Sequence, residues 1–578
     1  MGYLKGGAYL FQPAEKDSIF LPENASEEQN MIFRTCQDFV KQEIYPVQDD
    51  IEAQKDGLAE SLFKKMGDLG LLGLHMPEEY GGSDLDANTV ALMLIGIGTM
   101  GSFNTPFAAH TGIGMLPFLY FGTDAQKEKY LPPMITGDLI ASYCLTEPTS
   151  GSDALSAKTL AKYNKEKGTY VLNGQKMWIS NAGYAGIFIV FAKLDGDKFT
   201  AFVVERDREG LTLGEEEKKL GIHGSSTRQV FLEDVKIPEE NLLGEIGKGH
   251  LIAFNVLNMG RFKLGTLCLA GCKEALRLGS DYAGQRVQFG QPIASFGAIQ
   301  YKIANMAVET AALSSATFRL SESLTDGINK FKADGHKAGE AKLLAAKDFA
   351  IECSVLKVVG SEALDYCVDE LVQIYGGMGY SEEAPPASMY RDSRINRIYE
   401  GTNEINRLLI VDQLFKRGMK GDLPLMDIIQ SAEVPQSECE YADDIRRALV
   451  KLLGYVGRAQ MEGNVDLEKD QQLVMALSNI AIELYVLESL WMRIEARKQA
   501  ELISDIEFWQ KLYELKSAKS FQVIRQSVME VLSSIFSDEV LTEKLDKVLA
   551  LLPIPNFSLT QFRKDVAQHV YDTATPIQ

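Results

Sequence analysis

Residues 168–180, GTYVLNGQKMWIS, belong to a β-rich segment inside a largely helical chain. Three more short runs in this segment are rich in β-branched and aromatic residues and are separated by Gly, Asn and Asp: GIFIVFAKL (186–194), KFTAFVVE (198–205) and STRQVFLEDVKIP (226–238). Runs of this kind are typical of β-strands. We therefore predict a β domain between about residues 140 and 245.

Helical patterns flank this segment on both sides. Apolar residues recur every three or four positions in residues 30–47 and 296–320, as on the buried face of a helix. Thr123 and Gln126 have the spacing of a capping box at a helix start. Prolines in residues 419–441 predict a linker, and a helical tail with one break at LLPIPNFSL (551–559) follows it.

These patterns predict an α+β, mainly α fold in four parts. The predicted parts are an N-terminal helical domain (1–137), a central β domain (138–246), a helical bundle (247–418) and a C-terminal helical domain (419–578). A chain of 578 residues is too long for one core, so several domains are expected.

Composition narrows the class of protein. Hydrophobic residues make up 46% and charged residues 24%, which is typical of globular proteins. The 59 basic and 80 acidic residues give a net charge of −21. An acidic chain repels nucleic acid and anionic lipid, so neither is an expected partner. No run of 18 apolar residues predicts a membrane span.

The first residues and the cysteines bear on location. MGYLKGGAYLFQPAEKD (1–17) lacks the apolar core of a signal peptide and the arginines of a transit peptide, so we expect a cytoplasmic, bacterial-type protein. The 7 cysteines and 6 histidines are scattered, without C-x-x-C spacing. Reduced, mostly buried thiols are therefore expected, and no metal site.

A glycine pattern at residues 94–101, LIGIGTMG, has the spacing of a dinucleotide-binding fingerprint. That fingerprint requires a βαβ unit and an acidic residue about 20 positions later, and the sequence that follows supplies neither. We interpret Gly96, Gly98 and Gly101 as small residues that let helices pack closely.

One carboxylate stands out in RIYEGTNEI (397–405). Glu400 lies between Tyr399 and Gly401 with apolar residues close by, and Thr402 and Asn403 favour a helix start. This predicts a tight turn that places a glutamate in the interior. Burial raises the pKa of a carboxyl group, so Glu400 is a candidate general base or acid.

Five motifs in order resemble the acyl-CoA dehydrogenase family. They are YCLTEPTSGSDA (143–154), NGQKMWISNA (173–182), QRVQFGQPI (285–293), QIYGGMGY (373–380) and RIYEGTNEI (397–405). The resemblance covers roughly residues 30–415. NVLNMGRF (255–262) and the helical tail make the chain most similar to the very-long-chain branch, which has a C-terminal helical domain and usually forms dimers.

The resemblance implies a fold with a central β-barrel domain and a defined reaction. The expected activity is FAD-dependent α,β-dehydrogenation of a long-chain fatty acyl-CoA to trans-2-enoyl-CoA, with electrons passed to an electron-transfer flavoprotein. No side chain accepts hydride, so the reaction itself requires a flavin. A base must take the α-proton, and donors must hold the thioester oxygen as enolate character develops. A homodimer is expected.

The matched motifs imply site residues. Glu400 is the expected base, and Gly260 occupies a position where some family members carry theirs. The cofactor-binding residues implied are Tyr143, Leu145, Thr146, Ser152, Trp178, Ile179, Ser180, Arg286, Phe289, Gln373, Ile374, Gly376, Gly377, Thr402, Asn403 and Glu404. Arg286 and Phe289 match residues that reach the cofactor of a neighbouring subunit. The substrate-binding residues implied are Ser152, Asn258, Arg261, Tyr375 and Gly401. Gln288 departs from the Thr, and Asn258 from the Asp, of many members.

Other interpretations share the motifs. An acyl-CoA oxidase that uses oxygen has the same fold, whereas a nitroalkane oxidase generally has Asp in place of Glu400. A non-catalytic assembly factor for a respiratory complex is a third alternative. Acidic residues in the linker, such as Glu438 and Glu440, oppose membrane association. The amphipathic stretch at 480–496 predicts domain core or a dimer interface.

Overall fold

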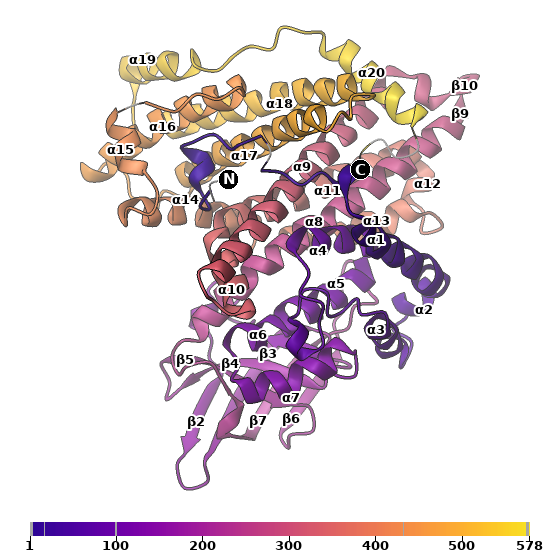
Figure 1. Cartoon of the computed structure of the whole chain (residues 1–578), viewed down its shortest axis with the longest axis vertical. Coiled ribbons are helices and arrows are strands. Elements are labelled where there is room, and N and C mark those ends of the chain that lie inside the picture. Colours follow the sequence, from indigo (N-terminus) through magenta and orange to yellow (C-terminus); the bar gives the residue numbers. More distant parts are fainter. Residues whose placement is uncertain (1–3, 17, 99–100, 432, 574–576, 578) are drawn as a thin grey trace.

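The computed structural model describes residues 4–16, 18–98, 101–431, 433–573 and 577. Most of them are helical, and the strands within residues 141–243 gather at one end of the molecule, opposite the C-terminal helices (Figure 1). The predicted α+β, mainly α fold is confirmed.

In the part of the chain that the structure describes, seven α-helices precede the strands. They are α1 (Glu27–Phe39), α2 (Gln48–Glu52), α3 (Leu58–Asp68), α4 (Ala87–Ile97), α5 (Gly101–Ala109), α6 (Leu116–Phe121) and α7 (Asp124–Ile135). The predicted capping box starts α7, where the Thr123 hydroxyl accepts from the Gln126 N–H and the Gln126 amide oxygen accepts from the Thr123 N–H. Each bond satisfies an N–H that the first helical turn leaves free.

Eight strands of the described residues form one sheet. They are β1 (Ala141–Cys144), β2 (Leu160–Asn164), β3 (Thr169–Ser180), β4 (Ile187–Leu194), β5 (Lys198–Glu205), β6 (Leu211–Glu216), β7 (Thr227–Pro238) and β8 (Leu242–Leu243). Their order is β6-β7-β3-β2-β4-β5-β8, and β1 pairs in parallel with β4. Among the described strands β6 and β8 do not pair with each other, so the expected barrel is not closed by hydrogen bonds.

Strand β4 is buried on both faces. Phe188 and Val190 pack into the core inside the β domain. Ile189 and Phe191 pack against α6, α7 and the first turns of the helix that begins at residue 249. Side chains alternate between faces along a strand, so a strand with two buried faces has a continuous apolar sequence. GIFIVFAKL is such a sequence, and its second buried face packs the β domain against the helices.

The helical bundle follows. It comprises α8 (Gly249–Gln285), α9 (Gly297–Ala333), α10 (Ala338–Asp348), α11 (Ala350–Tyr375), α12 (Gly377–Tyr380), α13 (Pro385–Ser393) and α14 (Asn403–Met419). A small hairpin, β9 (Val287–Gln288) with β10 (Gln291–Pro292), separates α8 from α9. Helices α8 and α11 approach closely at Gly265 and Gly360, where a Cβ on Gly360 would lie 2.8 Å from the Gly265 Cα.

Close packing also explains the glycines at 94–101. A Cβ on Gly96 would lie 2.9 Å from the Cys36 Cβ in α1, and one on Gly98 would lie 2.7 Å from the Ala270 Cβ in α8. Residues 94–97 are helical rather than part of a βαβ unit. Positions 99 and 100 lie outside the described residues. The described part therefore agrees with the helix-packing interpretation.

The C-terminal helices are α15 (Leu425–Ser431), α16 (Glu440–Met461), α17 (Gln471–Gln499), α18 (Ile506–Ser533), α19 (Asp538–Leu549) and α20 (Leu559–Asp572). The linker prediction was wrong for residues 425–431, which form α15. Pro424 directly precedes this helix. A proline at a helix start removes no helical hydrogen bond, because its N–H would have had no partner there. Leu425 then packs on Gly418 and is buried.

Helix α17 is long and apolar enough to cross a membrane, with a mean hydropathy of 1.6 over its most apolar stretch. Within the protein 83% of that stretch is buried. Its Leu484, Leu487 and Leu490 are fully covered by neighbouring side chains. Helix α17 is therefore a core helix of the C-terminal region, as predicted for residues 480–496.

The N-terminal segment lies between the bundle and the C-terminal helices. Tyr9, Leu10 and Phe11 are buried, and the Tyr9 ring packs edge-on against Tyr485 of α17 with centroids 4.9 Å apart. The Tyr9 carbonyl accepts from Arg446 Nε of α16 at 2.9 Å. No local pattern predicts this contact, which joins residues 437 positions apart in the chain.

Buried charges sit beside this contact. Glu488 of α17 accepts from Arg319 of α9 at 2.8 Å and from Arg446 of α16, and all three side chains are almost fully buried. The Ala14 N–H also donates to Glu488. Burial opposes ionisation of Glu488, but the two guanidinium groups hold its pKa below the usual value. Four separate segments therefore meet at one carboxylate.

All seven cysteines are buried and free, as predicted. Burial raises the pKa of the Cys36 and Cys144 thiols to about 12. Thiols of this kind stay protonated near neutral pH and act as small apolar side chains.

Candidate active site

A left-handed turn presents Glu400. Glu400 has φ 58° and Gly401 has φ 81°, between a 3₁₀ turn (Arg394–Arg397) and the start of α14. Thr402 is the predicted N-cap, and its hydroxyl accepts from the Ile405 N–H at 3.2 Å. A non-glycine residue with positive φ is uncommon and is often found at functional sites. The turn that the sequence predicted is therefore present, and its backbone is strained.

Hydrogen bonds from two side chains hold this turn in place. Asn406 Nδ2 donates to the carbonyl oxygens of Gly401 at 2.8 Å and Thr402 at 3.0 Å. Arg261 Nε of α8 donates to the Glu400 carbonyl at 3.3 Å. Both side chains are buried, so the position of the Glu400 backbone is fixed from two sides.

The carboxylate of Glu400 faces α8 at Gly260. A Cβ on Gly260 would lie 2.5 Å from Glu400 Oε2, so only glycine leaves room for the carboxylate there. Oε2 is buried and has no hydrogen-bond partner among the described residues. Burial raises the pKa of Glu400 to about 7, although Arg261 and Lys357 act in the opposite direction. Glu400 is therefore poised to exchange a proton near neutral pH.

Two charged side chains stand behind the turn. Arg261 Nη1 donates to Asn258 Oδ1 at 2.9 Å, which gives Asn258 a partner within the protein. Lys357 Nζ of α11 donates to Asn403 Oδ1 at 2.7 Å. Burial lowers the pKa of Lys357 to about 8. These cations offset part of the cost of a negative charge on Glu400.

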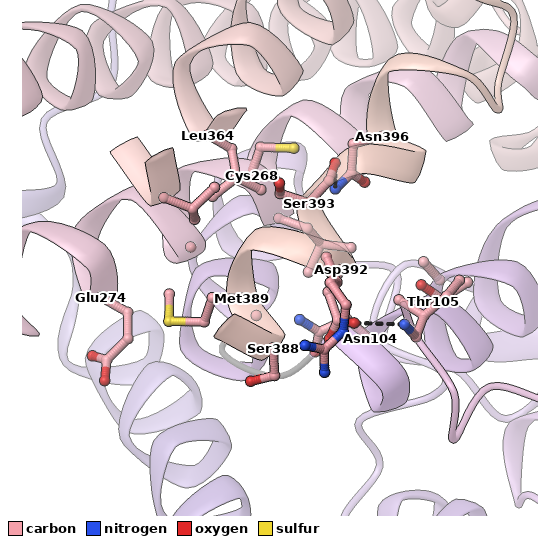
Figure 2. A pocket seen from close by; sticks show the side chains of 18 of the residues that line it. Asn104, Thr105, Cys268, Glu274, Leu364, Ser388, Met389, Asp392, Ser393 and Asn396 are labelled. Atoms are coloured by element: carbon pink, nitrogen blue, oxygen red, sulfur yellow. Dashed lines mark hydrogen bonds between the residues drawn. The ribbon is translucent and has the colours of Figure 1, made fainter. Parts of the chain in front are cut away.

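A cavity of about 730 Å³ opens beside Glu400. Its walls come from α5, α8, α11 and α13, and Figure 2 shows Asn104, Thr105, Cys268, Leu364 and Met389 among the side chains around it. Many other lining residues are small, including Gly98, Ala108, Ala109 and Gly271. A cavity with mostly apolar walls and a carboxylate at one end suits a chain-like apolar ligand.

The β domain forms the opposite wall. Ser180 at the end of β3 lines the cavity, and Tyr143 of β1 is buried near Glu400 with a hydroxyl that has no partner among the described residues. Burial raises the pKa of Tyr143, and the charge of Glu400 adds to this effect. Trp178 has φ 60° at a β-bulge in β3 and is 52% exposed. A large aromatic ring held open to solvent by a strained backbone is available to cover a ligand.

A buried ion pair shapes the loop after β1. Lys176 and Glu147 meet at 2.6 Å with almost no exposure, and Glu147 also accepts from the N–H groups of Lys158 and Thr159. Leu145 and Thr146 lie in this loop, and the Thr146 carbonyl accepts from the Met177 N–H at 2.9 Å. Ser152 follows and is exposed. Ile179, by contrast, points into the β-domain core, so only its backbone is left for a ligand.

The remaining expected cofactor residues gather at the other end of the bundle. Arg286 and Phe289 lie in the β9–β10 hairpin, where Phe289 has φ 51° and is 93% exposed. Gln373, Ile374, Gly376 and Gly377 lie where α11 ends and α12 begins. This distal group does not border the Glu400 cavity.

Tyr375 belongs to this distal group and does not line the Glu400 cavity, so its place in the substrate channel stays a prediction. Its ring stacks on Tyr282 of α8 at 3.9 Å, and its hydroxyl donates to the Leu278 carbonyl. Leu278 lies 18 residues beyond Gly260 on α8, a distance of about 27 Å at 1.5 Å per residue. The tyrosine beside Glu400 is Tyr399, which lines the cavity.

The start of α14 gives its side chains internal roles. Asn403 is 2% exposed, and its amide donates to Ser361 and Glu362. The Thr402 hydroxyl caps the helix, whereas Glu404 is exposed. A cofactor could therefore meet the backbone of Thr402 and Asn403 but not their side-chain oxygens. An N-terminal helix turn is a suitable place for such N–H contacts.

These features fit a flavin. The cavity extends from Glu400 to Ser180 of the β domain, the Tyr143 hydroxyl lacks a partner among the described residues, and Trp178 is half exposed. Tyr143, Thr146, Trp178 and Ser180 would hold the ring. Burial of an apolar ring against Trp178 would offset the strain of its backbone.

The sequence did not single out several cavity residues. Lys263 lies one turn after Gly260, and its Nζ donates to the Thr111 carbonyl and hydroxyl. Burial lowers the pKa of Lys263 to about 7. A lysine inside an apolar helical run is a detectable signal, at Lys263 in RFKLG and at Lys357 in VLKVV. Thr105 carries no such signal, because only the fold brings it to the wall.

Sequence models of three domains match the chain. Residues 26–138 match "Acyl-CoA dehydrogenase, N-terminal domain", residues 142–235 match "Acyl-CoA dehydrogenase, middle domain", and residues 247–415 match "Acyl-CoA dehydrogenase, C-terminal domain". Together they cover the helical, β and bundle regions described above.

Individual relatives agree. A probable acyl-CoA dehydrogenase of Bacillus subtilis is 40% identical over 98% of each chain. The very long-chain specific acyl-CoA dehydrogenase of Homo sapiens is 39% identical over 69% of this chain and 60% of its own length. The crystal structure of an acyl-CoA dehydrogenase complexed with FAD from Bacillus anthracis covers all of both chains with a TM-score of 0.95 and 40% identity.

Proposed function

This chain belongs to the acyl-CoA dehydrogenase family, and on that premise we propose that it converts a long-chain fatty acyl-CoA into trans-2-enoyl-CoA. Its family uses FAD and oxidises CH–CH bonds. The observation that carries the proposal is the Glu400 carboxylate, buried, without a partner among the described residues and facing a cavity with small apolar walls. The expected setting is fatty acid β-oxidation in a bacterial cytoplasm.

Each residue of the site has a separate role in the proposed reaction. FAD, when bound, supplies the acceptor for the hydrogen that leaves Cβ. Glu400 takes the α-proton, and the Glu400 N–H donates to the thioester oxygen as negative charge develops there. Gly401 lets the thioester approach the backbone. Arg261 holds the Glu400 backbone, so it positions the base rather than reacting.

The cavity supports a long acyl chain. Along α8 its wall extends from Gly260 to Leu278, about 27 Å at 1.5 Å per residue. An extended chain advances about 1.2 Å per bond, since an extended peptide residue of three bonds spans about 3.3–3.6 Å. The cavity therefore matches a chain of roughly 20–24 carbons. Thr105 and Ala109 leave it open where larger side chains would shorten it.

Anaerobic mixing with acyl-CoA tests the proposal. Flavin absorbance should bleach with hexadecanoyl-CoA, and reoxidation should be fast with electron-transfer flavoprotein and slow with oxygen. Fast reoxidation by oxygen would identify an acyl-CoA oxidase instead. A flavin that no acyl-CoA bleaches would favour the assembly-factor alternative.

The pH dependence follows from the pKa of Glu400. Below about 7 the carboxyl group is protonated and cannot accept the α-proton. We expect kcat/KM to rise about tenfold per pH unit up to pH 7 and to level off above it, because one deprotonation activates the free enzyme. Bleaching rates at low substrate concentration between pH 5.5 and 9 measure this. A flat profile over that range would contradict the assignment.

Dimer formation supplies the second part of the cofactor site in this proposal. Arg286, Phe289 and Gln373 lie too far from Glu400 to surround the same flavin ring, and an apolar ring that is 93% exposed is typical of an interface. Phe289→Ser should weaken both dimer and FAD binding, by about tenfold for loss of one aromatic contact. Sedimentation velocity and flavin content after gel filtration report the two effects. Ile554→Ser, at a residue that is 82% exposed, is the control. Loss of dimer without loss of flavin would contradict the link.

A further inference from the structure

The acyl cavity changes character along its length. Near Glu400 its α8 wall is Gly260, Lys263, Leu264, Leu267 and Cys268, and the Lys263 ammonium is bonded to Thr111. Further along the same helix the wall becomes Glu274, Arg277 and Leu278. Glu274 and Arg277 pair with each other at 2.7 Å, and the Arg277 side chain is 49% exposed. The α8 wall is thus mostly apolar near Glu400 and reaches solvent at its far end.

Other exposed residues complete this far end. They are Tyr45, Gln48 and Asp49 near α2, His223 in the loop before β7, and Glu382, Glu383 and Ser388 around the start of α13. Arg277 lies near Tyr45. Figure 2 shows Glu274 and Ser388 on the side of the cavity away from Cys268 and Asn396. We refer to these residues, with Glu52, Glu274, Arg277, Arg391 and Asp392, as the distal mouth.

The distal mouth is acidic. Its carboxylates are Asp49, Glu52, Glu274, Glu382, Glu383 and Asp392, against the guanidinium groups of Arg277 and Arg391. Arg391 is paired with Glu382 at 2.6 Å and Arg277 with Glu274, so neither cation is free to bind an anion. Four negative charges therefore remain in excess, apart from any charge on His223. A neutral polar group would be solvated there, and an anion would be repelled.

We propose that the distal mouth is a second opening of the acyl cavity, which admits long acyl chains that end in a neutral polar group and rejects those that end in a carboxylate. The substrate class is then long-chain acyl-CoA with an unmodified or hydroxylated tail end. This inference rests on the proposed function, since it concerns the tail of the same substrate.

Chain length should decide whether a terminal hydroxyl is tolerated. A tail of 12 carbons extends about 11 Å beyond the reacting carbons and ends beside Leu267 and Cys268. A hydroxyl there gives up its water inside a cavity whose walls are mostly apolar, which should lower kcat/KM about tenfold or more. A tail of 24 carbons extends about 25 Å and ends at the distal mouth, where the hydroxyl keeps its water. A cavity closed at its far end would impose the penalty at both lengths.

The test compares acyl-CoA esters of 12 and 24 carbons, each plain, ω-hydroxylated or ω-carboxylated, with the FAD-loaded enzyme. The hydroxyl penalty should be about tenfold at 12 carbons and absent at 24. The 24-carbon ω-carboxylate should react about tenfold more slowly than the ω-hydroxylated ester, and added salt should reduce this difference.

Variants separate the opening from its charge. Ser388→Trp should fill the mouth and restore the hydroxyl penalty at 24 carbons, whereas Ser533→Trp at the end of α18 should not. Glu52→Gln with Glu383→Gln should reduce the carboxylate penalty, and Glu468→Gln with Glu539→Gln should leave it. A hydroxyl penalty that is equal at both lengths in the native enzyme overturns the proposal, as does a 24-carbon ω-carboxylate that reacts as fast as the ω-hydroxylated ester. If plain 12-carbon and 16-carbon esters also fail to bleach the flavin, it is the proposed function that fails.

Discussion

Glu400→Gln should abolish flavin reduction by acyl-CoA while leaving a folded, yellow protein. The amide has the same shape, so it fits the space at Gly260 and the left-handed turn is unchanged. It cannot accept a proton, and loss of a general base typically costs about 10²–10⁴-fold in rate. No second carboxylate can substitute at Gly260, so the upper part of this range is expected. Stopped-flow bleaching with hexadecanoyl-CoA measures the rate.

Two further measurements make this result specific. Acyl-CoA binding by the variant, followed by the shift of the flavin spectrum, should persist because the backbone N–H of residue 400 remains. Glu245→Gln, an exposed carboxylate in the loop before α8, is the control and should bleach at the native rate. A variant at residue 400 that bleaches nearly as fast as the native enzyme would place the base elsewhere.

Glu488→Gln should give the largest loss of stability. The amide keeps the shape but leaves Arg319 without a carboxylate among the described residues, and Arg446 with Asp443 alone. Removing one partner of a buried ion pair typically costs about 3–5 kcal/mol. For a unit the size of the C-terminal region, this corresponds to an apparent Tm lower by on the order of 10 °C.

A surface pair provides the control. Lys16 and Glu438 also join the N-terminal segment to the C-terminal region, but Glu438 is 71% exposed. Exposed pairs contribute at most about 1 kcal/mol, so Glu438→Gln should shift Tm by only a few degrees. Calorimetry of the FAD-loaded protein at one scan rate measures both variants. Equal shifts would show that the buried cluster is not what holds the C-terminal helices to the bundle.

The sequence predicted those elements whose physics is local. The alternating and continuous apolar runs identified β3, β4, β5 and β7, and the capping box at Thr123 identified the start of α7. Helix α15 was missed because a proline marks a break without saying whether the next turn is helical. The N-terminal contact was missed because Tyr9 and Arg446 are 437 residues apart, and no local pattern records such a pair.

In the candidate site, too, local features could be predicted from the sequence and features that depend on the fold could not. The turn at Glu400 was predictable because its glycine, its cap and its apolar flanks are adjacent in sequence. The distance of Tyr375 from the Glu400 cavity could not be predicted, because motif order does not say which end of a 26-residue helix, α11, a residue occupies. Gly260 and Glu400 are 140 residues apart in the chain, and they face each other only because α8 packs against the turn. The folded structure is therefore needed to see that a side chain at 260 would displace the carboxylate.

The N-terminal segment has a consequence for how this protein is made. Tyr9, Leu10 and Phe11 pack on residues near 446 and 485, which a ribosome adds more than 400 residues later. At about 5–20 residues per second, the interval is on the order of 20–90 seconds. During that time the nascent chain presents an apolar AYLF sequence with no native place to bury it. Residues 8–11 are thus among the last to reach their native contacts, and a cell must shield them until residues 446 and 485 have been added.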